Sequence, residues 1–64
     1  MDSEHVTDLG VERLLMRAVH CRCRAVESAD IANIQTDPDR QVLMLKVAAQ
    51  WIKMAEQFEA LARP

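Results

Sequence analysis

The four residues "TDPD" at 36–39 are the one strong break inside a chain of 64 residues. Pro38 has no backbone N–H to donate to a continuing helix, and it disfavours helical geometry at Asp37. The same residues suit the start of a new helix, with Asp37 as N-cap, Pro38 in the first position and Asp39 as negative charge in the first turn. The break therefore predicts one helix ending near Ile34 or Gln35, a turn at 36–38 and a second helix over about 38–62.

The first helix is expected over about 7–35, from Thr7 or Asp8 onward, with the preceding residues frayed or in a short turn. We expect this late start because of Gly10, since a glycine inside a helix destabilises the helix by about 1 kcal/mol relative to alanine. A short connection makes two consecutive helices antiparallel neighbours. We therefore expect an all-α fold, a single antiparallel two-helix hairpin domain spanning residues 1–64.

Each expected helix has one broad apolar face when residues are placed about 100° apart. The face of the first helix is mostly small: Val11, Leu14, Ala18, Cys21, Ala25 and Ala32, flanked by Leu15, Val19 and Val26. The face of the second is large: Leu43, Met44, Val47, Ala48, Trp51, Met54, Ala55, Phe58, Leu61 and Ala62. Large side chains packed over small ones would divide the core volume well.

A second set of apolar residues lies away from these faces. It forms the candidate self-association face: Leu9, Met16, Cys23, Ile31, Ile34, Leu45 and Ile52. A hairpin can bury only one stripe per helix, and a chain of this length is marginally stable alone. We expect a homodimer that forms an antiparallel four-helix bundle. The alternative is a monomer that leaves part of its apolar surface exposed.

The segment "AVHCRCRAV" at 18–26 resembles a metal or redox cluster at first sight. Cys21 and Cys23 point about 160° apart on a helix, so they converge neither on a disulfide nor on one metal ion. Cys21 falls in the small core face and is interpreted as a small apolar residue. His20 and Cys23 would supply at most half of a zinc site. We therefore expect no metal and no cofactor.

Arg13, Arg17 and Arg24 form a basic stripe along one side of the first helix. The stripe is a candidate anion-binding face, but acidic residues are available to pair with it, and no aromatic residues interleave with the arginines. Arg22 lies nearer the apolar arc, where we expect it to extend past the rim or to pair with an acid.

The composition excludes several function classes. The net charge of −2 gives no general attraction to nucleic acid, and no apolar run is long enough to span a bilayer. The acidic first residues are unlike a secretory signal, so a cytoplasmic protein with reduced cysteines is expected. No nucleophile with a base, no phosphate loop and no buried carboxylate pair is visible, which argues against an enzyme.

Three short motifs carry a family resemblance: Ala18, Cys21, Arg22 and Ala25; then Asp37, Pro38 and Asp39, with Arg40 one place early; then Ala48, Trp51, Met54 and Ala55. They resemble a pattern, A-x-x-[CY]-R-x-x-A, D-P-[DE]-x-R and A-x-x-W-x-x-[LM]-A, of short alphaproteobacterial helical-hairpin proteins without an assigned function. The resemblance covers about the last two-thirds of the chain. It implies a hairpin, and it implies that tyrosine also fits at Cys21, which disfavours a zinc thiolate.

The sequence thus favours a non-enzymatic protein-interaction module that acts through helix–helix packing, by self-association or by binding another helical protein. Two alternatives stay open: a small regulator that docks on a helical bundle of a signalling protein, and a weak anion or nucleic-acid binder that uses Arg13, Arg17 and Arg24. No membrane partner is expected.

Overall fold

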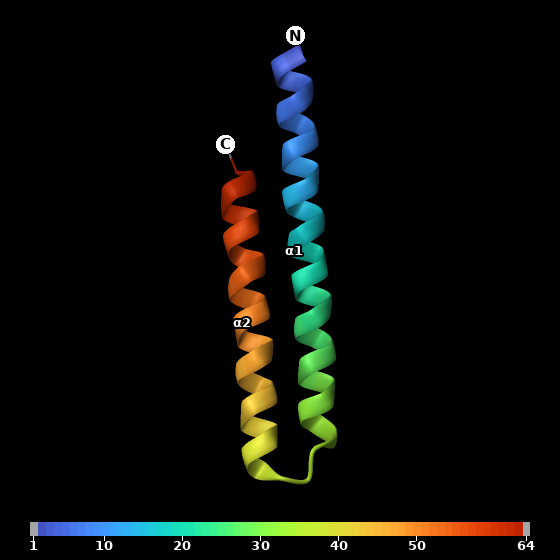
Figure 1. Cartoon of the computed structure of the whole chain (residues 1–64), viewed down its shortest axis with the longest axis vertical. Coiled ribbons are helices and arrows are strands. Elements are labelled where there is room, and N and C mark those ends of the chain that lie inside the picture. Colours follow the sequence, from blue (N-terminus) through green and yellow to red (C-terminus); the bar gives the residue numbers. More distant parts are fainter. Residues whose placement is uncertain (1, 64) are drawn as a thin grey trace.

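The chain forms two long antiparallel helices joined by a tight connection (Figure 1). The computed structural model describes residues 2–63, and their side chains from Leu9 to Arg63. Helix α1 spans Asp2–Ile34 and helix α2 spans Pro38–Ala62, with no strand in the described part of the chain. The Cα atoms extend over 56 × 14 × 9 Å, so the molecule is a thin rod. The predicted all-α helical hairpin is confirmed.

The expected start of the first helix was wrong, because α1 begins at Asp2 rather than at about Thr7. Gly10 lies inside the helix, and a Cβ atom built there would meet nothing within 4 Å. A single glycine weakens a helix by about 1 kcal/mol, which does not suffice to end it when the neighbouring residues continue it. As a result, the N-terminal end of α1 projects beyond the end of α2 (Figure 1).

The connection has the capping geometry that the sequence predicts. The side chain of Asp37 accepts a hydrogen bond of 2.9 Å from the backbone N–H of Asp39, and Pro38 occupies the first turn of α2. The last turn of α1 is capped from the other helix, because the Gln41 side-chain amide donates to the carbonyl oxygen of Ala32 at 3.2 Å. The turn thus ties the end of α1 to the start of α2.

The core is a narrow seam of small side chains. Its buried members are Ala18, Cys21, Ala25, Ser28 and Ala32 on α1, and Ala48 and Ala55 on α2. Trp51 and Phe58 pack against the cluster of Ala18, Cys21 and Ala55. The Ser28 hydroxyl donates to the Arg24 carbonyl one turn earlier at 2.9 Å, which satisfies the one buried polar side chain of the seam. In this cluster, large residues of α2 cover small residues of α1, as the sequence predicts.

The buried faces are narrower than the sequence suggested. Leu43, Met54 and Leu61 were expected on the buried face of α2, but all three are exposed. Two isolated helices bury only the side chains near the line of contact, so residues that lie sideways stay open to solvent. Within the described residues, no large side chain is fully buried.

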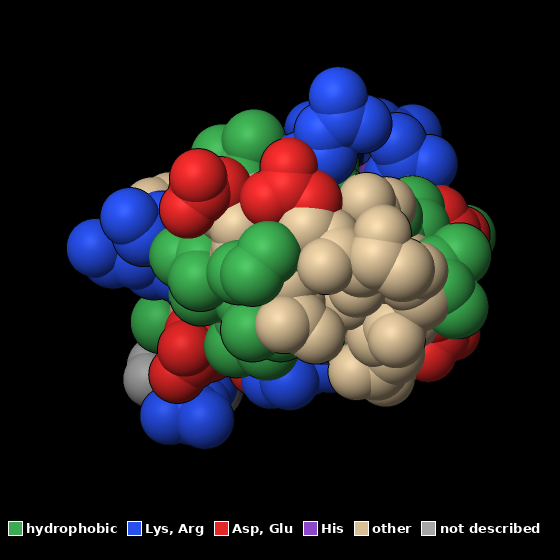
Figure 2. All heavy atoms as spheres, turned by 90° about the horizontal axis from the view of Figure 1, so that it is seen from below, with side chains coloured by type: hydrophobic (Ala, Val, Ile, Leu, Met, Phe, Trp, Pro, Cys, Tyr) green, Lys and Arg blue, Asp and Glu red, His purple; other side chains and the backbone are tan. Residues whose placement is uncertain are grey.

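From Leu9 to Arg63, thirteen large apolar residues are exposed: Leu9, Leu15, Met16, Val19, Val26, Ile31, Ile34, Val42, Leu43, Leu45, Ile52, Met54 and Leu61. The end-on view of Figure 2 shows apolar side chains reaching the surface on several sides of the rod. Within residues 2–63, neither helix is long and apolar enough to cross a membrane.

Candidate functional site

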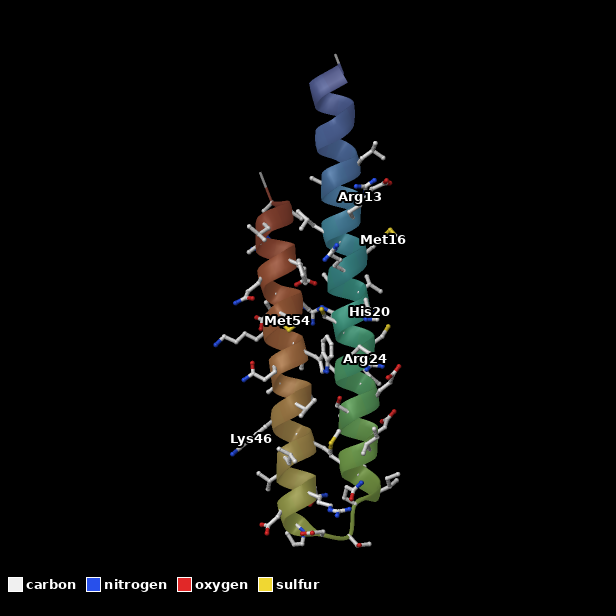
Figure 3. The ribbon with its side chains drawn as sticks, in the orientation of Figure 1. Arg13, Met16, His20, Arg24, Lys46 and Met54 are labelled. Carbon is white, nitrogen blue, oxygen red and sulfur yellow. The ribbon has the colours of Figure 1, made fainter. Side chains whose placement is uncertain are left out.

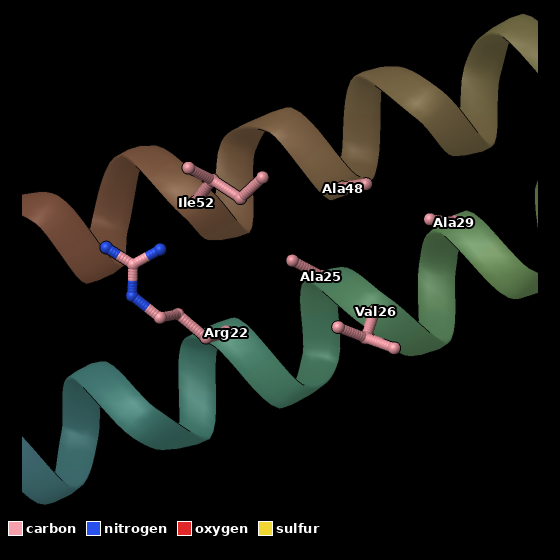
Figure 4. A pocket seen from close by; sticks show the side chains of 6 residues that line it. All are labelled: Arg22, Ala25, Val26, Ala29, Ala48 and Ile52. Carbon is pink, nitrogen blue, oxygen red and sulfur yellow. The ribbon is translucent and has the colours of Figure 1, made fainter.

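A groove runs along one side of the seam between the two helices (Figure 4). It has a volume of about 320 Å³. It is lined by Arg22, Ala25, Val26, Ala29, Ala48 and Ile52. Alanine side chains allow the two backbones to approach and leave a shallow floor, while Val26 and Ile52 rise beside it. The lining is apolar except for Arg22, so the groove suits an apolar side chain rather than a polar ligand.

The apolar character continues along both helices beyond the groove. Val19 lies two helical turns before Val26, and Leu45 lies two turns before Ile52, so each pair shares one side of its helix. Leu15 extends the row on α1 and is also exposed. We call the surface formed by Leu15, Val19, Val26, Ala29, Leu45 and Ile52 the groove face.

One ion pair spans the groove face and links the two helices. The guanidinium of Arg22 donates two hydrogen bonds to the Glu59 carboxylate, of 2.9 and 2.7 Å. This hydrogen bonding lowers the pKa of Glu59 below its ordinary value and raises that of Arg22. Glu56 lies near enough to raise the pKa of Arg22 further. The expectation that Arg22 pairs with an acid is confirmed, although the sequence did not identify Glu59.

The structure divides the predicted self-association residues among three sides. All seven are exposed. Leu45 and Ile52 belong to the groove face. Met16 lies on the side of α1 turned away from α2 (Figure 3), and the spacing of Leu9, Cys23 and Ile34 places them there too. Ile31, two turns after Arg24, lies on the side of the arginines.

The opposite side of the seam carries the basic stripe. The Arg17 guanidinium carbon lies 6.0 Å from the Phe58 ring centroid, and that of Arg24 lies 5.6 Å from the Trp51 ring. Arg24 also pairs with Glu27 at 3.3 Å. The exposed Arg13 continues the stripe one turn before Arg17 (Figure 3). No aromatic residue interleaves in the sequence of α1, but α2 supplies two in space, which sequence spacing alone does not reveal.

The histidine and the cysteines do not converge. Cys21 is buried in the seam and Cys23 is exposed on the outer side of α1. The rings of His20 and Trp51 form a T-shaped pair, with centroids 6.4 Å apart and planes at 90°. Among the side chains that the structure describes, no three His, Cys, Asp or Glu residues gather closely enough to hold a metal ion.

Comparison of the chain with protein-family models, with curated proteins and with solved structures finds no match. The resemblance to short alphaproteobacterial hairpin proteins therefore stays a prediction. The surfaces themselves carry the argument about function.

Proposed function

We propose that this protein is a non-enzymatic interaction module that works by packing its exposed helix faces against other helices, most simply those of a second copy. The observation that carries the proposal is the amount of surface the hairpin leaves open. Its accessible area is 5288 Å² for a mass of 7.3 kDa. A compact monomer of this mass exposes about 4,200 Å², so the hairpin exposes about 1,100 Å² more, part of it on the end of α1 that projects past α2.

The kind of surface supports the same proposal. Met16 is 71% exposed, Val26 60% and Ile34 78%. Soluble monomers expose scattered apolar residues, but contiguous apolar rows mark contact surfaces. The seam buries mostly alanine, which contributes little hydrophobic stabilisation because its side chain has one carbon. Association would supply the larger apolar contacts that the isolated hairpin lacks.

The test is the molar mass of the purified chain in solution. Sedimentation equilibrium over a range of concentrations should give twice the 7.3 kDa of one chain at micromolar protein. Circular dichroism should show high helix content in the same samples. A helical protein that sediments as a monomer and unfolds cooperatively would contradict self-association.

The same exposed faces would also serve a regulator that docks on the helices of another protein. A regulator should form a weak dimer that dissociates when its partner protein is present and is replaced by a complex with that partner. If self-association is itself the function, the dimer should be tight. Sedimentation of the chain mixed with a co-purified partner separates the two. In either case, we propose a cytoplasmic setting, where Cys21 and Cys23 would stay reduced.

Binding of an anion or nucleic acid is a weaker candidate for the basic stripe. Arg17 and Arg24 lie over aromatic rings, and Arg24 also has Glu27 beside it, so part of their charge is already engaged. Retention on DNA or RNA that falls with salt, and that is lost when Arg13, Arg17 and Arg24 become Ala, would establish this function instead.

A further inference from the structure

We propose that the groove face is the surface that a second copy of this chain covers, in a two-fold contact that forms a four-helix bundle. This inference rests on the proposed self-association and specifies where it occurs. It keeps Leu45 and Ile52 from the self-association face expected from the sequence, and it leaves out the other five residues of that face: Leu9, Met16, Cys23, Ile31 and Ile34.

The shape of the groove face suits a copy of itself. Its floor is made of Ala25, Ala29 and Ala48, and its edges carry the larger Val26 and Ile52 (Figure 4). In a two-fold contact the same patch supplies both partners, so a projecting side chain must meet a recess of the same surface. The groove offers both features side by side. On the outer side of α1 there is one helix and therefore no recess between two.

The area is consistent with a single contact of this kind. A face as long as α2, about 38 Å, and two helix diameters wide, about 20 Å, covers about 760 Å². A dimer of standard size buries about 800 Å² on each partner. The approximately 1,100 Å² that the hairpin exposes beyond a compact monomer therefore accommodates one groove-face contact.

Charge distinguishes the two sides of the seam. Opposite the groove, a two-fold contact would bring Arg17 and Arg24 near the same arginines of the other copy, which like-charge repulsion opposes. On the groove face the guanidinium of Arg22 already has the Glu59 carboxylate at 2.7 Å. A compensated pair can lie within an interface without leaving an unpaired charge.

Charge-introducing variants test the location. Val26→Glu and Ile52→Glu, made singly, place a carboxylate on the groove face. Each should raise the dimer dissociation constant about ten-fold or more, because the added carboxylate must either lose its hydration in an apolar contact or take Arg22 from Glu59. Met16→Glu is the matched control, since it introduces the same charge at an exposed apolar site on the outer side of α1. It should leave the dissociation constant within about three-fold of the unmodified chain.

A second measurement needs no substitution at the interface. Cys23 lies on the outer side of α1, one helical turn from Val19 and from Val26. A groove-face dimer therefore leaves its thiol at the edge of the contact, still open to a reagent such as dithionitrobenzoate, whereas a dimer through the outer side of α1 would bury it. Labelling of Cys23 should therefore slow only partly as protein concentration crosses the dimer dissociation constant, and should not stop. Cys21, buried in the seam, should react only after unfolding. This readout applies even if Val26→Glu or Ile52→Glu fails to fold.

The outcomes separate the location from the proposed function. Dimerisation that is weakened by the groove-face variants, with labelling of Cys23 that continues in the dimer, supports both. A dimer in which labelling of Cys23 stops, or that Met16→Glu disrupts while the groove-face variants do not, overturns the groove-face assignment and leaves self-association intact. A chain that stays monomeric at all concentrations overturns both.

Discussion

At the scale of single residues, burial in this protein depends on size as much as on polarity. Ala18, Cys21 and Ala55 are buried, whereas Met16 and Ile34 are exposed. Only small side chains fit between two backbones in close contact, and larger ones must lie beside the seam. Between residues of equal size the helix face decides: Cys21 faces the seam and is buried, whereas Cys23 lies about 160° around α1 and is in solvent.

Protonation of Glu59 should weaken the hairpin in acid. Its pKa is lowered in the folded chain, chiefly by hydrogen bonds from Arg22, so its contribution is fully present above its ordinary value of 4.5. The contribution is lost as pH falls through the lower pKa of the folded state. Urea unfolding between about pH 6 and pH 3 should show a steeper loss for the unmodified chain than for Glu59→Gln. Glu56→Gln controls for the loss of one negative charge.

Gly10 offers a stabilising substitution. It lies inside α1 at a position with open space around a Cβ atom and without a positive φ. Gly10→Ala should raise the unfolding free energy by about 0.5–1 kcal/mol, because alanine is the better helix former. Chemical denaturation measures the change, and Ala49→Gly, at an exposed site within α2, should give a change of opposite sign. A destabilised Gly10→Ala variant would indicate that this part of α1 is not helical in solution.

At the scale of the elements, the seam between α1 and α2 is set by close approach. Ala55 of α2 has no exposed surface and packs with Ala18 and Cys21 of α1. Trp51 and Phe58, which are also on α2, pack against this cluster. The sequence predicted which residues form this seam because their spacing follows one helix face. It did not predict how little of Leu43, Met54 and Leu61 would be covered, since that depends on the number of neighbouring helices.

Overpacking the seam should force the helices apart. Ala55→Leu adds three carbons where no space remains, and it should lower the unfolding free energy by about 1–3 kcal/mol. Ala60→Leu makes the same change at an exposed site of α2 and should have an effect within about 0.5 kcal/mol. Thermal and urea unfolding of both variants give the comparison. Equal stability of the two variants would mean that the helices are not in contact at Ala55.

At the scale of the whole molecule, the fold could be predicted from the sequence and the surface arrangement could not. The break at Asp37–Pro38 and the helical spacing define two antiparallel helices. The groove face depends on which side of each helix turns toward the other, and this rotation joins Ile52 with Val26 while separating Ile52 from Met16. Periodicity along one helix contains no information on that pairing.

Stability should depend on protein concentration if the hairpin associates. Binding of a second copy to the folded state stabilises it by mass action, so the melting temperature should rise as the concentration is increased above the dimer dissociation constant. Circular dichroism melts over about a hundred-fold range of concentration measure the effect. A melting temperature that is constant over this range would indicate a hairpin that is stable without a partner.

The tight connection between the helices also has a consequence for how the chain folds. Gln41 bonds to Ala32, Ala48 lies beside Ala25, and Glu59 pairs with Arg22, so each contact further from the turn joins residues further apart in the sequence. Once the turn has formed, each next contact closes only a short additional loop, at little extra entropic cost. The interhelical contacts can thus form stepwise, starting at the turn and continuing toward the free ends of the two helices. Most close residue pairs of the chain are local in sequence, and helical proteins rich in local contacts fold within microseconds to milliseconds.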